Sequence, residues 1–141
     1  MYPMTAKDEM MFKTPDALLN GEATVQVIQS CIPQIKNAWA MPSIDCDAAL
    51  IAIRMATYGE SMTLPVTVPG TKIEKDLELN LQETLTTILG ATYNDTFLYE
   101  NMEIKTRPLS YAEFTASALK QFEQSRLQSV ITVSYTHLTL P

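Results

Sequence analysis

The segment from Met41 to Glu60, MPSIDCDAALIAIRMATYGE, constrains the fold more than any other part of this sequence. Most of its length is apolar around nearly the whole circumference of a helix, which is typical of a helix buried on more than one side. Pro42 disfavours a helical conformation at the residue before it, so Ser43 is placed to act as the N-cap. Gly59 favours a stop at the other end. We therefore predict a central, buried helix from Ile44 to Tyr58.

The chain before this helix carries two further helix signals. Thr14, Pro15 and Asp16 form a helix start, with a cap, a proline at the first helical position and an acid in the first turn. The stretch from Glu22 to Cys31 predicts a second helix, although its β-branched residues weaken helix propensity. The segment from Met4 to Phe12 is compatible with a short strand or with an extended arm.

After Gly59 the hydrophobic period changes from helical to alternating, which predicts β-strands. Two hairpins follow, and a short helix from Leu81 to Leu89 lies between them. The predicted strands cover residues 61–68 and 73–79 in the first hairpin and residues 97–99 and 102–106 in the second, around a turn at Glu100 and Asn101.

A last helix begins after Ser110, which forms a capping box with Glu113. We predict that this helix runs from Tyr111 to about Ile131. Its apolar stripe is expected to face inward and consists of Tyr111, Phe114, Ala118, Leu119 and Phe122. The predicted fold class is therefore α+β: a small helical domain with a central buried helix, two β-hairpins and a C-terminal amphipathic helix.

Length and charge exclude several classes of protein. A chain of 141 residues is long enough for one domain with its own core. Its net charge of −6 argues against binding to the backbone of a nucleic acid. No apolar run approaches the roughly 20 residues that span a bilayer, and no signal peptide is evident at the N-terminus. We therefore expect neither a nucleic-acid partner nor a membrane partner, and the host cytosol as the default compartment.

No group of residues has the pattern of a catalytic, cofactor-binding or metal site, so we predict none of these and no small-molecule substrate. Cys31 and Cys46 lie in apolar helical contexts typical of inert core cysteines. Asp45 and Asp47 lie in the first turn of the central helix, where carboxylates usually complement the helix dipole. Residues two apart on a helix do not face each other, so they do not form an acid/base pair.

The last nine residues, Val133 to Pro141 (VSYTHLTLP), read as the translation of a transposon adaptor end used in shotgun sequencing. We therefore interpret residues 133–141 as read-through that is not native, which points to a metagenomic source and makes His137 non-native. Residues 1–132 are then a single domain, truncated at its C-terminus, and we expect the natural protein to continue. The alternative is a natural β-prone tail.

Three blocks of this sequence resemble, in the same order, the baseplate hub protein family of T-even-like phages, whose tails are contractile. The blocks are KTPDALLNGEATVQVIQSCIP, IDCDAALIAIRMATYGE and RPLSYAEFTASALKQFEQSRL, and the resemblance covers roughly residues 3–132. It implies a structural or assembly protein of the baseplate hub that contacts other baseplate and tail proteins. The expected location is the virion tail baseplate, or the host cytoplasm during assembly.

The same resemblance bears on metal binding. Relatives often carry Cys-Pro-x-Cys at a hairpin turn, whereas this chain has Val68 and Thr71 at the positions of the two cysteines. Neither side chain is a usual zinc ligand, so no metal is expected.

Two alternatives stay open from the sequence. Within the structural class, the protein is either a permanent virion component or a transient assembly factor. From another class, it is a hub-associated hydrolase that cleaves the cell wall, which would need an acid/base pair in a cleft.

Overall fold

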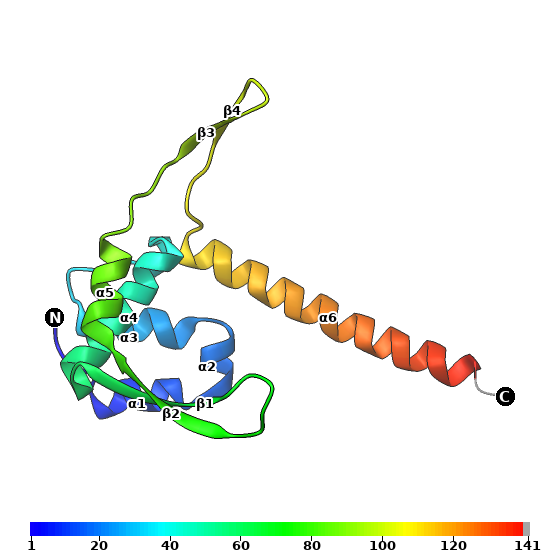
Figure 1. The fold of residues 1–141 in the computed structure, drawn as a ribbon, viewed down its shortest axis with the longest axis horizontal. Helices are drawn as coiled ribbons and strands as arrows, with labels where there is room; N and C mark the ends of the chain where they lie inside the picture. The colour runs from blue at the N-terminus through cyan, green and yellow to red at the C-terminus, as the bar shows by residue number, and fades with distance from the viewer. Residues whose placement is uncertain (140–141) are drawn as a thin grey trace.

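The computed structural model describes the backbone of residues 1–139 and the side chains of residues 1–127. Figure 1 shows a helical body from which two β-hairpins and one long helix project. In chain order the elements are α1 (Ala6–Phe12), α2 (Pro15–Leu19), α3 (Glu22–Cys31), the 3₁₀ helix η1 (Ala38–Ala40), α4 (Ser43–Tyr58), β1 (Ser61–Thr67), β2 (Glu74–Asn80), α5 (Leu81–Leu89), β3 (Thr96–Tyr99), β4 (Met102–Lys105) and α6 (Tyr111–Thr139). This arrangement confirms the predicted α+β class.

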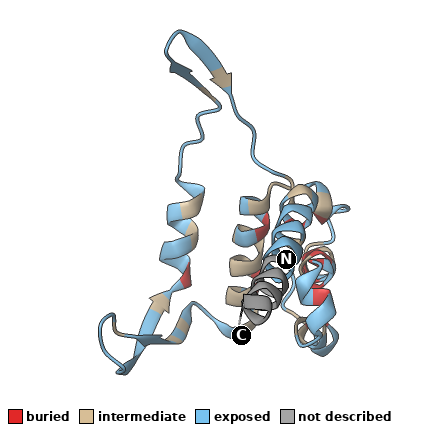
Figure 2. Ribbon diagram, turned by 90° about the vertical axis from the view of Figure 1, so that its right-hand side faces the viewer, coloured by how far each residue is buried: buried red, intermediate tan, exposed pale blue. Residues whose placement is uncertain are grey.

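Helix α3 supplies most of the core. Its fully or nearly fully buried residues are Ala23, Val25, Val27, Ile28 and Cys31. Helices α1, α2 and α4 all pack against it, and Figure 2 shows the buried residues concentrated in the helical body. The β-branched residues that lowered its helix propensity therefore do not prevent the helix, because burial of their side chains outweighs propensity.

Helix α4 is less buried than the sequence predicted. It lies between α3 and α5, but only Cys46 and Ile53 are buried, and Ile51 is half-buried. Its main packing partners are helices rather than the two hairpins: α3 and α5 pack against it, and both hairpins lie apart from the helical body in Figure 2. An apolar circumference shows how much surface a helix can bury, but the burial that it reaches depends on how many elements pack against it.

The segment from Met4 to Phe12 is neither a strand nor an extended arm, because α1 occupies most of it. Thr5 and Asp8 form a capping box: the Asp8 N–H donates to the Thr5 hydroxyl, and the Thr5 N–H donates to the Asp8 carboxylate at 2.8 Å. Asp8 is buried and also accepts a hydrogen bond from the Ser30 hydroxyl of α3. Burial alone would raise the pKa of Asp8, but the bonds from Thr5 and Ser30 outweigh it and lower the pKa.

The starts of α4 and α6 are tied to each other. Ser43 is the first residue of α4 rather than its cap, and Pro42 is the N-cap. The Ser43 N–H donates to the Leu109 carbonyl at 2.9 Å, and the Tyr111 N–H donates to the Met41 carbonyl at 2.7 Å. Two backbone bonds therefore fix where α6 leaves the body.

Both predicted hairpins are present, and each forms a two-stranded antiparallel sheet. In the first, Leu64 lies opposite Leu77. In the second, Tyr99 lies opposite Met102, and the two turn residues, Glu100 and Asn101, both have positive φ. This is the geometry of the two-residue turns that match the twist of the strands.

Helix α6 differs from prediction in two respects. The expected inward stripe forms only at its start: Tyr111 packs against the core, but the exposed fractions of Phe114 and Phe122 are 49% and 55%, because the helix projects from the body beyond its first turns (Figure 1). The predicted end near Ile131 is also wrong, since the helical backbone continues to Thr139. The side chains of residues 133–141, interpreted above as non-native read-through, lie outside the described residues.

Candidate interaction surfaces

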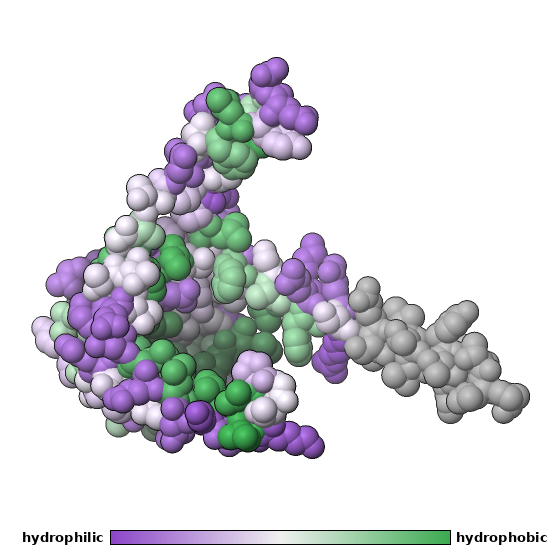
Figure 3. All heavy atoms as spheres, in the orientation of Figure 1, coloured by the Kyte–Doolittle hydropathy of each residue, from purple (hydrophilic) through white to green (hydrophobic). Residues whose placement is uncertain are grey.

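The β3–β4 hairpin carries one wholly apolar face. The register pairs Phe97 with Ile104 and Tyr99 with Met102. Opposed residues share a face and alternate residues of a strand point the same way, so these four side chains lie on one side of the hairpin. We call them the β3–β4 apolar face. The exposed fractions of Phe97, Tyr99 and Met102 are 49%, 57% and 57%, and Figure 3 shows hydrophobic atoms gathered at this projecting tip.

The opposite face of the same hairpin is mixed. It pairs Leu98 with Glu103 and Thr96 with Lys105. An isolated two-stranded hairpin is at best marginally stable in water. A hairpin that projects from the body and exposes a continuous apolar face is typical of a surface that binds another protein.

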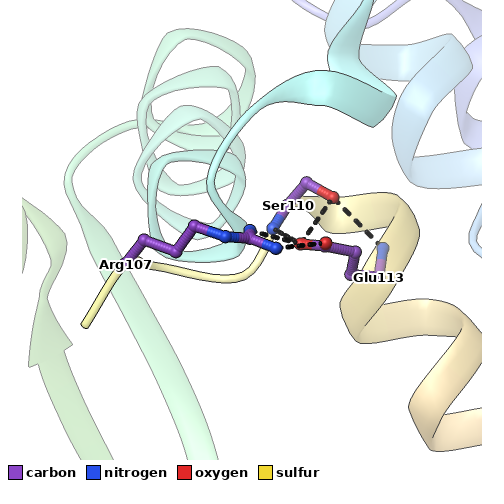
Figure 4. Close-up of polar contacts among 3 residues, drawn as sticks. All are labelled: Arg107, Ser110 and Glu113. Atoms are coloured by element: carbon purple, nitrogen blue, oxygen red, sulfur yellow. Dashed lines mark hydrogen bonds and ion pairs between the residues drawn. The ribbon is translucent and has the colours of Figure 1, made fainter. Parts of the chain in front are cut away.

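The root of this hairpin is held by a charged hydrogen-bond network (Figure 4). Arg107 donates two parallel bonds to the Glu113 carboxylate of α6, at 2.9 and 2.7 Å. Glu113 also accepts from the Ser110 backbone N–H at 3.0 Å, while the Ser110 hydroxyl accepts from the Glu113 N–H at 3.2 Å. The predicted capping box is confirmed, and Arg107 adds a bidentate link from the hairpin to the helix.

The electrostatics of this network follow from its donors. The bonds from Arg107, followed by the one from the Ser110 N–H, lower the pKa of Glu113 to about 2. The Glu113 carboxylate therefore stays ionised well below the ordinary pKa of a glutamate. In the segment that leads into β3, the Tyr93 hydroxyl donates to the Thr106 carbonyl, which follows β4, at 2.8 Å.

The β1–β2 hairpin also has two unlike faces. One face is mainly apolar and includes the pairs Met62–Leu79 and Leu64–Leu77. The other face carries Glu74, Asp76 and Glu78 on β2 opposite Thr67, Pro65 and Thr63 on β1. All three carboxylates are on exposed residues.

A cleft of about 450 Å³ lies between the start of α4 and the end of α5, beside the root of the β3–β4 hairpin. Its walls are mainly apolar and include Ile44, Ala48, Ile88 and Leu89. Asp45 is the one carboxylate that lines it. A glycoside hydrolase of the usual type needs two carboxyl groups in its cleft, so this cleft does not provide the arrangement that the enzyme alternative requires.

The two cysteines occupy the positions expected of core residues. Both are buried and neither forms a disulfide. Burial raises the pKa of the Cys46 thiol to about 11, and burial also raises the pKa of Cys31. Nucleophilic chemistry needs an accessible thiolate, which neither cysteine provides.

The turn of the first hairpin is closed without metal ligands. The Val68 N–H donates to the Ile73 carbonyl at 3.0 Å, and the Thr71 hydroxyl donates to the Val68 carbonyl at 3.0 Å. Across the described residues, no three His, Cys, Asp or Glu side chains are grouped to hold a metal ion. That the protein binds no metal stays a prediction.

Among the described residues, no helical segment has both the length and the hydrophobicity that a membrane span requires.

Sequence reasoning missed the β3–β4 apolar face, although the signal was present. A two-residue turn at Glu100 and Asn101 makes Tyr99 the partner of Met102, and the alternation then places Phe97 beside Ile104. The register follows from the turn. The exposure of this face does not follow from the turn, because it depends on the direction in which the hairpin projects from the body.

Comparison with known proteins identifies the family to which the chain belongs. The model of a family described as "T4 bacteriophage base plate protein" matches residues 2–136. The chain therefore belongs to the T4 bacteriophage base plate protein family, and it is a structural protein of the phage baseplate with its place in the virion tail. No curated protein and no solved structure matches the chain significantly.

Proposed function

We propose that this protein builds the hub of a contractile-tail baseplate through protein–protein contacts, and that it has no enzymatic role. The observation that carries the proposal is the β3–β4 apolar face, which a projecting hairpin exposes to solvent. Aromatic and methionine side chains of this kind are enriched at protein interfaces. The partner is another baseplate or tail protein, and the complex forms in the host cytoplasm during assembly.

The hairpin supplies a matched pair of variants for the test. Phe97→Ser with Met102→Ser removes two members of the apolar face, whereas Leu98→Ser removes an even more exposed apolar side chain from the opposite face. Each variant would be co-expressed with the other baseplate proteins of the same phage, and the complexes would be separated by size-exclusion chromatography.

We expect the Phe97/Met102 variant to elute alone and the Leu98 variant to co-elute with its partners as the parent does. Loss of an interface anchor typically weakens binding by about 2 kcal/mol or more. Equal complex formation by both variants would contradict the proposed role of this face.

Two further measurements sharpen the proposal. Mass spectrometry of purified virions separates a permanent component from an assembly factor that leaves the particle. An assay of cell-wall cleavage by the recombinant protein, run beside Asp45→Asn, tests the enzyme alternative. Cleavage that disappears in the Asp45 variant would overturn the non-enzymatic role.

A further inference from the structure

The two edges of the β1–β2 sheet differ in whether they can accept another strand. The Leu81 N–H donates to the Glu60 carbonyl, and the Val68 N–H donates to the Ile73 carbonyl, so the residue pairs just outside both ends of the ladder are hydrogen-bonded pairs. Hydrogen-bonded and non-hydrogen-bonded pairs alternate along an antiparallel ladder. The pair Pro65–Asp76 is therefore a non-hydrogen-bonded pair, and the backbone groups of both residues point out of the sheet.

The outer edge of β1 is closed by Pro65. Proline has no N–H, so a strand added along β1 would lose a ladder bond at its middle, and the ring would stand in its path. Because the missing N–H faces outward, Pro65 costs no bond to β2. Its position allows the hairpin to form and blocks growth of the sheet on that side.

The outer edge of β2 is open. By the same alternation, the N–H and C=O groups of Glu74, Asp76 and Glu78 point outward. Every residue of β2 except Leu79 is exposed. We call this row of outward backbone groups the β2 edge. A row of unpaired donors and acceptors is a template for strand addition.

Charge decides which strand fits the β2 edge. If two copies paired antiparallel through this edge, with Asp76 opposite Asp76, Glu74 would lie opposite Glu78, so the carboxylates of the two copies would oppose one another. A net charge of −6 adds repulsion between copies. A strand with lysine or arginine at the same positions would instead pair each carboxylate with a cation. Its alternate residues would lie on the face of Leu77 and Leu79, where apolar side chains fit.

We propose that β2 binds, as an added third strand, an extended segment of another baseplate protein in which basic and apolar residues alternate. The addition converts a two-stranded hairpin into a three-stranded sheet, which is more stable. This inference rests on the proposed function for the identity of the partner, but it uses a different hairpin from the β3–β4 apolar face.

The test uses a short synthetic peptide in which lysine and valine alternate, and a second peptide with glutamate in place of lysine. Binding to the full chain would be followed by the amide shifts of the protein in NMR. Asp76→Pro removes one outward N–H and leaves the hairpin ladder intact, as Pro65 does on the opposite strand. Thr63→Pro makes the same change on the edge that Pro65 already closes, and it is the matched control.

We expect the lysine peptide to bind and to shift the amides of Glu74, Asp76 and Glu78, and the glutamate peptide not to bind. Asp76→Pro should weaken binding about tenfold or more, because it removes a strand–strand hydrogen bond and a charge pair. Thr63→Pro should bind as the parent does. A variant with Glu74→Gln, Asp76→Asn and Glu78→Gln keeps the outward backbone groups of β2 and removes their negative charge. It should also bind the lysine peptide more weakly, although it introduces no proline.

Failure of the lysine peptide to bind, unchanged binding by both Asp76→Pro and the charge-free variant, or equal binding of the glutamate peptide would each overturn the inference. The Phe97/Met102 variant of the other hairpin should bind the peptide normally. That result separates the β2 edge from the proposed role of the β3–β4 apolar face, since either can fail while the other holds.

Discussion

The helical body and the projecting hairpins use apolar residues in opposite ways. In the body, α3 contributes Val27 and Ile28 with no exposed surface, and three other helices cover it. In the β3–β4 hairpin, Phe97 and Tyr99 are about half exposed although they share a face with Met102. Burial stabilises the fold by about 25 cal/mol per Å² of apolar surface. The hairpin gains little of this free energy within the chain, so its apolar residues are available to a partner.

The largest difference in stability between the helical body and the hairpins is expected from a substitution in α3. Ile28→Ala should lower the free energy of unfolding by about 2–5 kcal/mol, because it leaves a cavity in a closed core. Ile73→Ala, at a residue with 61% of its surface exposed, should change it by about 0.5 kcal/mol or less. Urea denaturation measures both. Equal losses would mean that the core is not centred on α3.

A pair of glycine substitutions tests how tightly the body holds α6. Gly21 and Gly70 both have positive φ, at 79° and 78°. A Cβ on Gly21 would lie 3.0 Å from side-chain atoms of Thr115 and Tyr111 in α6, whereas a Cβ on Gly70 would meet nothing within 4 Å. Both alanine variants incur the backbone strain of roughly 1–2 kcal/mol.

Gly21→Ala should therefore cost about 1–3 kcal/mol more than Gly70→Ala, because it also overpacks the contact with α6. Thermal denaturation of the two variants gives the difference. If the two losses are the same, α6 does not pack closely against the start of α3 in solution.

The link between the hairpin and α6 predicts a pH response. The pKa of Glu113 is lowered in the folded chain to about 2, first by Arg107 and then by the Ser110 N–H. A lowered pKa stabilises the fold at pH values above the ordinary carboxyl pKa, and this contribution is lost as the pH falls towards 2. A carboxyl NMR titration should show Glu113 ionised down to that range, and Arg107→Ala should move its pKa back towards the ordinary value. An unchanged pKa in the variant would show that the bidentate contact is absent in solution.

The smallest effect is expected at the C-terminal end. Deletion of residues 133–141 should change the free energy of unfolding by no more than about 0.5 kcal/mol, as is typical of changes away from the core. Denaturation of the shortened chain checks this. A large loss of stability, or a longer genomic sequence that continues through the same codons, would show that residues 133–141 are native.

Local signals in the sequence predicted much of this fold. The bounds of α3, the capping box of Ser110 and Glu113, and the turn at Glu100 and Asn101 all follow from residue types at fixed spacings. The capping box of Thr5 and Asp8 has the same form, and it could have predicted α1.

The distribution of burial could not be predicted in this way. α4 is the more apolar stretch, but α3 has neighbours on more sides. Phe114 and Phe122 follow a helical stripe, but α6 projects beyond the surface that would cover them. Periodicity identifies the apolar face of an element, whereas its burial depends on contacts between distant parts of the chain.

The central claim is that the body is complete in the free chain and that the hairpins are completed by partners in the baseplate. Amide hydrogen exchange, measured on the free protein and on the assembled baseplate, tests this directly. We predict slow exchange of the α3 amides in both samples, and exchange of the β2 and β3–β4 amides that is fast in the free protein and slow in the baseplate. Hairpin amides already as protected as those of α3 in the free protein, or still unprotected in the baseplate, would contradict the claim.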